Sequence, residues 1–270
     1  EEGVDPHKHF SGKFSLRVDP ELHEAAAIAA AAHGQSLNQW AAEAAAYLPP
    51  DAIEDLLRDH AKAVADAGEK ARAIFDQAAG EAGVRSDWRS LDGDSDEMMF
   101  RFARRVDLTV FPTVATACFG QHVIPAADLA LSCGGPVLVT PGTPIGPTVG
   151  KRVLVAWKGN RESARALRDA WPLLAQADEV HVLMVGPRAD DAPDSLLQRH
   201  LEHHGRRCDI IVERSPDASA ADILRRQVGI LQADLLVMGL YGRPRMAERV
   251  LGGVSDDLLR DPPCALLVSH

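Results

Sequence analysis

The sequence contains no apolar run that approaches the roughly 18–20 residues needed to cross a bilayer. Its first residues also lack the basic and then apolar pattern of a secretory leader. We therefore expect a cytoplasmic protein that has no membrane partner.

Cysteine is scarce, with 4 in 270 residues. The cysteines lie far apart and form no CxxC pair, so the sequence predicts neither a disulfide framework nor a zinc site. We expect reduced thiols in the core or at its edge. They are Cys118, Cys133, Cys208 and Cys264.

A metal site built from histidine is also not expected. His200, His203 and His204 fall on one face of a predicted helix, where they could bind zinc or nickel. No carboxylate or cysteine at a suitable spacing completes the set. We interpret the three histidines as a solvated helix end and predict no metal.

Basic residues are outnumbered, and the formal net charge is −10 at pH 7. The acidic excess lies in residues 1–150, whereas 151–270 are balanced. Such a chain has no broad attraction for nucleic acid. A content of 46% hydrophobic and 25% charged residues is that of an ordinary globular protein, and the length allows one large domain or two smaller ones.

Residues 151–270 alternate short apolar runs with amphipathic stretches. Strands that alternate with helices need crossover connections, which are nearly always right-handed and produce a parallel sheet with helices on both faces. The pattern therefore predicts an α/β domain. Its expected strands are 153–157, 180–185, 209–213, 234–238 and 264–268, and its expected helices are 162–174, 194–204, 219–231 and 254–260.

Residues 48–150 repeat the later part of this pattern. Asp107–Phe111 aligns with Asp234–Met238, and Asp128–Val139 aligns with Asp257–Val268. These alignments predict a second α/β unit that lacks its opening. The elements expected before Asp107 are a long helix over 51–79, a strand over 86–91 and a helix over 95–104.

Residues 1–47 have a different pattern, of one strand and two helices. Lys13 to Val18 alternates, with apolar side chains on one face and Lys13, Ser15 and Arg17 on the other. Asp19-Pro20 is typical of a helix start, and Ser36–Gln39 predicts a second start after Gly34. The boundary is expected near Tyr47.

Residues 51–270 resemble a tandem universal stress protein whose first copy is incomplete. The resemblance rests on VLVAWKGNRESARAL (153–167), ADLLVMGLYGRPRMAERVLGGVSDDLL (233–259) and PCALLVSH (263–270). It implies flavodoxin-like, doubly wound parallel sheets in two tandem units, 48–150 and 151–270. It also implies that the last strands of the copies, 136–140 and 264–268, meet across a pseudo-two-fold axis.

The same resemblance implies a site for ATP or a related adenine nucleotide. Members of the family that bind ATP carry G-x2-G-x9-G followed by Ser or Thr. The positions here are Gly239, Gly242, Gly252, Gly253 and Ser255. The chain departs from the pattern because Gly253 replaces the Ser or Thr, and because Lys158 stands where the family places an acidic residue after the first strand.

The glycine spacing has two physical interpretations. Glycines after a strand let a phosphate approach the backbone, and the amino terminus of the next helix favours an anion. Alternatively, the glycines only permit tight turns and close packing. The first copy has Pro112 and Ala115 at these positions, so we expect no nucleotide there.

Residues 10–46 resemble the ribbon-helix-helix segment of HicB-type antitoxins, on SGKFSLRVDPELHEAAAIAAAAHGQSLNQW. The resemblance implies that two copies pair their strands and that Lys13, Ser15 and Arg17 read DNA in the major groove. The negative charge of the segment opposes this role. Alternatively, Lys13–Val18 is the missing first strand of the first unit.

No Ser-His-Asp order, paired carboxylates or Walker-type Lys-Ser/Thr stands out, so we expect no enzyme. We interpret the chain as a dimeric, non-catalytic regulatory protein of the universal stress type that binds an adenine nucleotide. The alternative is a DNA-binding autoregulator of the antitoxin type. A third hypothesis is an interaction scaffold without a ligand.

Overall fold

The computed structural model describes residues 50–90, 95–113, 125–143, 145–146, 148–186, 194–214, 218–240 and 253–270. The chain divides into two compact units. One comprises Glu1–Leu91 with Thr116–His122, and the other comprises Asp92–Ala115 with Val123–His270. The predicted strand and helices of residues 1–47 lie outside the described residues.

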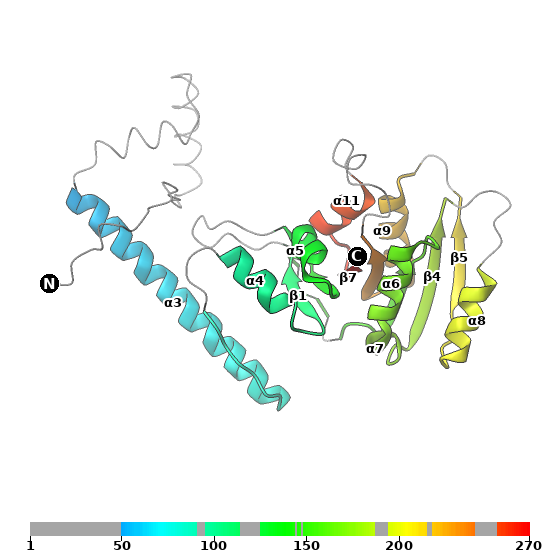
Figure 1. Ribbon diagram of the computed structural model, residues 1–270, viewed down its shortest axis with the longest axis horizontal. Coiled ribbons are helices and arrows are strands. Elements are labelled where there is room, and N and C mark those ends of the chain that lie inside the picture. Colours follow the sequence, from blue (N-terminus) through cyan, green and yellow to red (C-terminus); the bar gives the residue numbers. More distant parts are fainter. Residues whose placement is uncertain are drawn as a thin grey trace, which may run out of the picture. The chain divides into compact units, whose positions relative to one another are not determined.

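One long helix, α3 (Pro50–Ala82), belongs to the first unit (Figure 1). It confirms the helix predicted over 51–79. The helix ends at Gly83, which has a φ of +64°, and the Val84 N–H bonds to the Ala79 carbonyl at 3.2 Å. Glycine is favoured at such an end because it adopts a positive φ without a side-chain clash.

The strand predicted over 86–91 is wrong for residues 86–90, which form no strand. A strand needs a neighbour that takes up its N–H and C=O groups. Trp88 instead packs on the Phe75 ring of α3, with the ring centroids 5.5 Å apart. An aromatic residue that packs against a helix gives the same local sequence pattern as one in a strand, which explains the wrong prediction.

The second unit is built on one sheet (Figure 1). Its described strands have the order β1-β2-β7-β6-β3-β4-β5. Every neighbouring pair is parallel except β2 and β7. The parallel arrangement predicted for 151–270 is therefore confirmed. The strands are β1 (Thr109–Pro112), β2 (Val137–Thr140), β3 (Arg152–Ala156), β4 (Glu179–Val185), β5 (Asp209–Glu213), β6 (Leu235–Gly239) and β7 (Ala265–Ser269).

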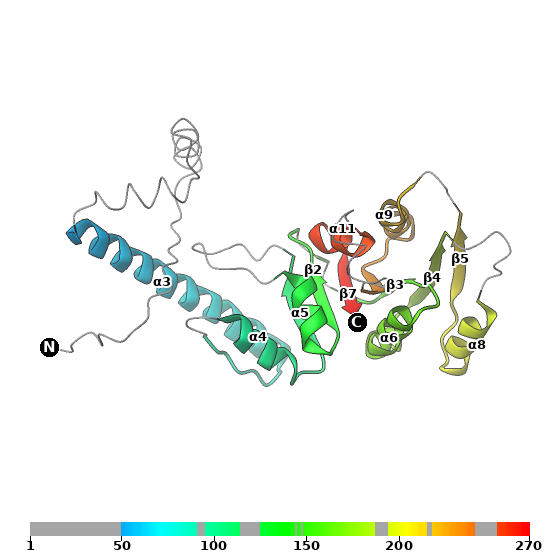
Figure 2. The same cartoon turned by 45° about the horizontal axis from the view of Figure 1, so that its top comes forward.

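Helices cover both faces of this sheet (Figure 2). One apolar cluster joins the sheet to α4 (Ser95–Ala103), α5 (Ala126–Cys133), α9 (Ala220–Leu231) and α11 (Val254–Arg260). A second cluster joins its other face to α6 (Arg161–Asp169), α7 (Trp171–Leu174) and α8 (Ser195–His203). This double cover explains why the central strands are continuous apolar runs.

The helix predicted over 162–174 is divided into α6 and α7. Ala170 ends the first helix and precedes the second, and Pro172 follows directly. Proline has no N–H to donate and suits a first turn, so it favours a new helix start over continuation of α6.

The antiparallel contact between β2 and β7 is the predicted meeting of 136–140 with 264–268. Leu138 pairs with Leu267, and the sequence alignment makes these two residues equivalent. Each also has an equivalent parallel neighbour, Val110 for Leu138 and Val237 for Leu267. A local two-fold relation therefore passes through the Leu138–Leu267 pair.

The two sides of this local axis differ in cover. Val237 is 0% exposed under α6, whereas its equivalent Val110 is 60% exposed. Within the described ranges, no counterpart of α6 lies over β1, and no strand flanks the outer edge of β1. Among the described residues, β1 is thus open on this face, whereas Leu138 of β2 still packs against the second apolar cluster.

The described cysteines are free thiols. Cys133 and Cys208 are buried, and Cys264 is partly buried. Burial, with the negative charge of Asp234 as a second cause, raises the pKa of the Cys264 thiol to about 12. Cys264 is therefore a protonated, inert thiol near neutral pH.

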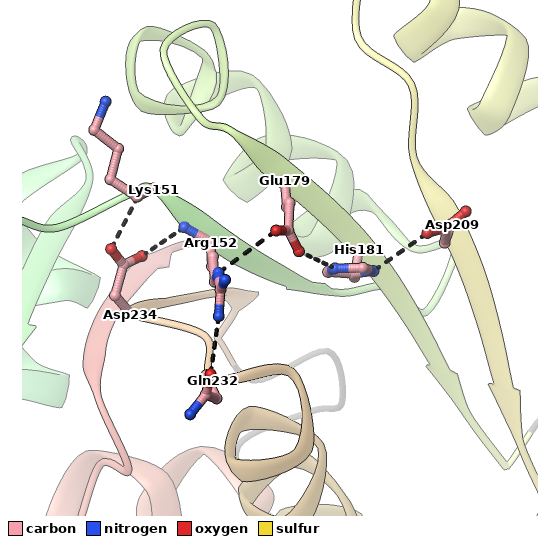
Figure 3. A network of polar contacts seen from close by, with 7 residues as sticks. All are labelled: Lys151, Arg152, Glu179, His181, Asp209, Gln232 and Asp234. Atoms are coloured by element: carbon pink, nitrogen blue, oxygen red, sulfur yellow. Dashed lines mark hydrogen bonds and ion pairs between the residues drawn. The ribbon is translucent and has the colours of Figure 1, made fainter.

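Figure 3 shows polar contacts at the amino-terminal ends of β3 to β6. The Asp234 carboxylate accepts backbone N–H bonds from Gly150, Lys151 and Arg152, each at 3.0 Å. These bonds fix the start of β3 beside the start of β6. The register between the two strands is consequently held from one end.

Side chains extend this network across the sheet to β5 (Figure 3). The Arg152 guanidinium donates to Gln232 at 3.0 Å and lies 3.5 Å from Glu179. His181 lies between two carboxylates, with Nε2 3.5 Å from Glu179 and Nδ1 3.7 Å from Asp209. The contacts therefore link three neighbouring strands through their side chains.

We expect Asp234→Ala to lower the free energy of unfolding by about 2–3 kcal/mol, because three backbone donors lose a charged acceptor. Asp234→Asn should cost less, since it keeps one acceptor oxygen. Urea unfolding measures both. The control is Asp209→Ala, at a side chain that is 83% exposed, with an effect within about 0.5 kcal/mol. Equal effects of the two alanine variants would contradict the role of Asp234.

Candidate functional site

The carboxyl ends of β3 and β6 are the candidate site. These strands are parallel neighbours, but the chain leaves β3 toward β4 and leaves β6 toward β7, on opposite sides. In open α/β sheets ligands bind at such a switch point, outside the carboxyl ends of the strands. The predicted glycine motif begins at this place, with Gly239 as the last residue of β6.

The turn from β3 to α6 forms one side of this site. Gly159 has a φ of +68°, which an L side chain rarely adopts. The Asn160 side chain accepts the Ser163 N–H at 3.0 Å, and the Asn160 N–H donates to the Ser163 hydroxyl at 3.2 Å. This reciprocal cap uses the first free amides of α6. Lys158 is exposed just before the cap.

Gly239 is in close contact with the first turn of α6. A Cβ added at Gly239 would lie 2.6 Å from both the Glu162 carbonyl oxygen and the Ser163 nitrogen. Packing against this backbone therefore already requires glycine. Pro112 is the equivalent residue at the end of β1, where no counterpart of α6 is found among the described residues. A larger residue is tolerated there, since no described helix backbone approaches it as α6 approaches Gly239.

The start of α11 carries two other predicted residues. Gly253 is its N-cap in an extended conformation, and Ser255 is buried in the first turn. Asp256 and Asp257 lie in the same turn. Acidic side chains at a helix amino terminus use the positive end of the helix dipole, so they compete with an incoming phosphate.

The remaining predicted site residues cannot be placed. Gly242 and Gly252 lie outside the described residues. The same holds for Lys13, Ser15 and Arg17, which were predicted to contact DNA.

The sequence reasoning missed a partner for Trp157, the residue that follows β3. The indole Nε1 donates to the Asp194 carboxylate at 3.0 Å, and the same carboxylate caps α8 by accepting the Leu197 N–H at 3.0 Å. Asp194 before an amphipathic run is a recognisable N-cap signal, but its second bond joins residues far apart in sequence.

The predicted histidine cluster is a set of ring contacts. The His204 ring packs on Trp171 with centroids 4.6 Å apart and on His200 at 4.7 Å. Within the part of the chain that the structure describes, no group of three or more His, Cys, Asp or Glu is arranged to hold a metal ion. No described helix is both long and apolar enough to cross a membrane.

Comparison with known families gives two matches. Residues 150–270 match the Universal stress protein family, and residues 1–44 match the HicB family. Residues 150–270 form a universal stress protein domain. The resemblance to universal stress proteins is thereby confirmed for residues 150–270, and the resemblance to HicB for residues 1–44. No curated protein is similar enough to count as a match.

Solved structures that are similar to this chain include three of universal stress proteins, and the first of them has the same fold. A universal stress protein from Archaeoglobus fulgidus DSM 4304 has a TM-score of 0.55 at 16% identity, over 75% of this chain and 78% of that chain. A universal stress protein family member from Burkholderia pseudomallei has 0.34 at 20%, over 46% and 98%. A universal stress protein in complex with cAMP also has 0.34 at 20%, over 44% and 97%.

In the universal stress protein domain, Gly239→Ala should lower the free energy of unfolding by about 1–3 kcal/mol, because the added Cβ overlaps backbone atoms of α6. The matched control is Gly229→Ala in α9, where a Cβ meets nothing within 4 Å. That change should raise stability by about 0.5–1 kcal/mol, since alanine favours helix. Thermal or urea unfolding of both variants checks the opposite signs, and two stabilised variants would contradict the packing role.

Proposed function

We propose that this protein is a non-catalytic regulator of the universal stress type that binds an adenine nucleotide. The carrying observation is the position of the glycine motif, which starts at the carboxyl end of β6 and finishes at the start of α11. These are the two places from which backbone amides reach a phosphate in an α/β sheet. The universal stress protein domain supports the same function.

Charged side chains near the glycine motif determine which part of a nucleotide the site favours. The exposed ammonium of Lys158 follows β3, and a cation there favours the phosphates of a nucleotide. Asp256 and Asp257 oppose them from the first turn of α11. We infer that binding depends mainly on the glycine backbone and that the phosphates contribute more than the ribose, because the acidic residue expected at position 158 is replaced.

Titration calorimetry with ATP and with cAMP tests the nucleotide site. We expect one site per chain, and Gly242→Val should weaken binding by more than about tenfold because its side chain blocks the approach of the phosphates. Gly146→Val is the control, at an exposed glycine where a Cβ meets nothing within 4 Å. Absence of binding to the unaltered protein, or equal binding by both folded variants, would refute the site.

A second function rests on a separate observation, the HicB family match of residues 1–44. We propose that this segment binds DNA as a dimer, with Lys13, Ser15 and Arg17 toward the bases. The universal stress protein domain is then the sensing part of an autoregulator. A homodimer suits this function because ribbon-helix-helix strands act in pairs.

A mobility shift on the protein's own upstream DNA, at two salt concentrations, tests this second function. Affinity should fall as salt rises, because contacts to phosphates release counterions. Lys13→Ala with Arg17→Ala should abolish the shift. The control is Lys62→Ala with Arg72→Ala on α3, which makes the same change in charge at exposed positions. No shift at low salt, or equal loss in both variants, would exclude specific binding by the segment.

A further inference from the structure

A pocket of 310 Å³ lies between α6 and α8, beside the end of β3. None of the described residues of the glycine motif, which are Gly239, Gly253 and Ser255, lines this pocket. Its volume lies at the lower end of the range that small-molecule sites occupy. An inference about this pocket therefore does not depend on the nucleotide hypothesis.

The Trp157 side chain forms one end of the pocket in a fixed orientation. Its indole N–H is held by one oxygen of Asp194, and the other oxygen of Asp194 accepts the Leu197 N–H. Both carboxylate oxygens and the indole donor are thus occupied. What Trp157 offers to a ligand is its apolar ring, and the small side chain of Ala164 leaves room beside it.

The other end of the pocket is basic. Arg168 lies one helical turn after Ala164 on α6, and His200 lies one turn after Leu196 on α8. The exposed Arg168 guanidinium makes no hydrogen bond or ion pair with any described residue. Arginine donates in a planar fork that matches a carboxylate.

Leu196 adds an unusual apolar element at the mouth of the pocket. Its side chain is 74% exposed, although the neighbouring Leu197 is buried. An exposed leucine by itself needs no explanation. Here it extends the apolar end of the pocket, opposite to the end where Arg168 and His200 lie.

We propose that this pocket binds a small amphipathic carboxylate. Its apolar group, aromatic or branched, lies against Trp157, Ala164 and Leu196, and its carboxylate contacts Arg168 and His200. A ligand without an apolar group leaves the Trp157 end empty. A ligand without a negative charge leaves the guanidinium unpaired. The ligand class therefore combines both properties.

The first experiment uses 3-phenylpropionate and its uncharged analogue 3-phenylpropanamide as probes of the full chain. The indole N–H signal of Trp157 is followed by two-dimensional NMR and assigned with Trp157→Phe. We expect a saturable shift with the carboxylate and a dissociation constant about fivefold or more weaker for the amide, since a charge-assisted hydrogen bond is lost. No shift, or equal affinity for both probes, would overturn the proposal.

Matched variants then separate the two ends of the pocket. Arg168→Gln should remove the preference for the carboxylate, whereas Arg199→Gln, an exposed arginine of α8 outside the lining, should leave it unchanged. Ala164→Leu fills the apolar end and should abolish binding of both probes. Circular dichroism checks that each variant is folded. Unchanged binding by folded Arg168→Gln or Ala164→Leu would place the probe elsewhere and overturn the site.

Discussion

The pairing of β2 with β7 is the interaction on which the rest of the second unit depends. A sheet of two strands is marginal in water, and β1 and β2 alone would be such a sheet. Through Leu138 and Leu267 they become part of a larger one. The apolar cluster beneath α4, α5, α9 and α11 then continues without a break across the join. The strands β1 and β2 are thus stabilised by the core of the sheet that residues 151–270 build.

The pairing of β2 with β7 also explains why the two sides of the local two-fold axis differ. On the face that carries α6, α7 and α8, cover ends near the local axis, so Val110 is exposed where Val237 is not. The last residue of β1 differs from the last residue of β6 for the same reason. Pro112 is acceptable there, whereas Gly239 must leave space for the backbone of Glu162 and Ser163. Both differences follow from the absence of a counterpart of α6 among the described residues.

Much of the fold was predictable because buried parallel strands are short apolar runs between helices of regular period. The repeated Asp-Leu-x-Val pattern at Asp107 and Asp234 also located equivalent strands. Prediction failed where a local pattern has two physical causes. Trp88 packs on a helix instead of entering a sheet. Pro172 lies in the first turn of a new helix, α7, instead of in a continuation of α6. The hydrogen bonds that Asp234 accepts from the start of β3 were not predicted, because the donors lie some eighty residues earlier in the chain.

The candidate site shows why the spacing of glycines in a motif is weak evidence for a ligand site. Glycine is required both where a phosphate meets the backbone and where another backbone element does, and the sequence is the same in either case. At Gly239 the second cause is sufficient, because the amino terminus of α6 occupies the space of a side chain. The need for glycine at this position is therefore no evidence for a ligand. The pocket at Trp157 has no sequence motif. Its lining residues come from two helices that are separate in the sequence and are brought together by the fold.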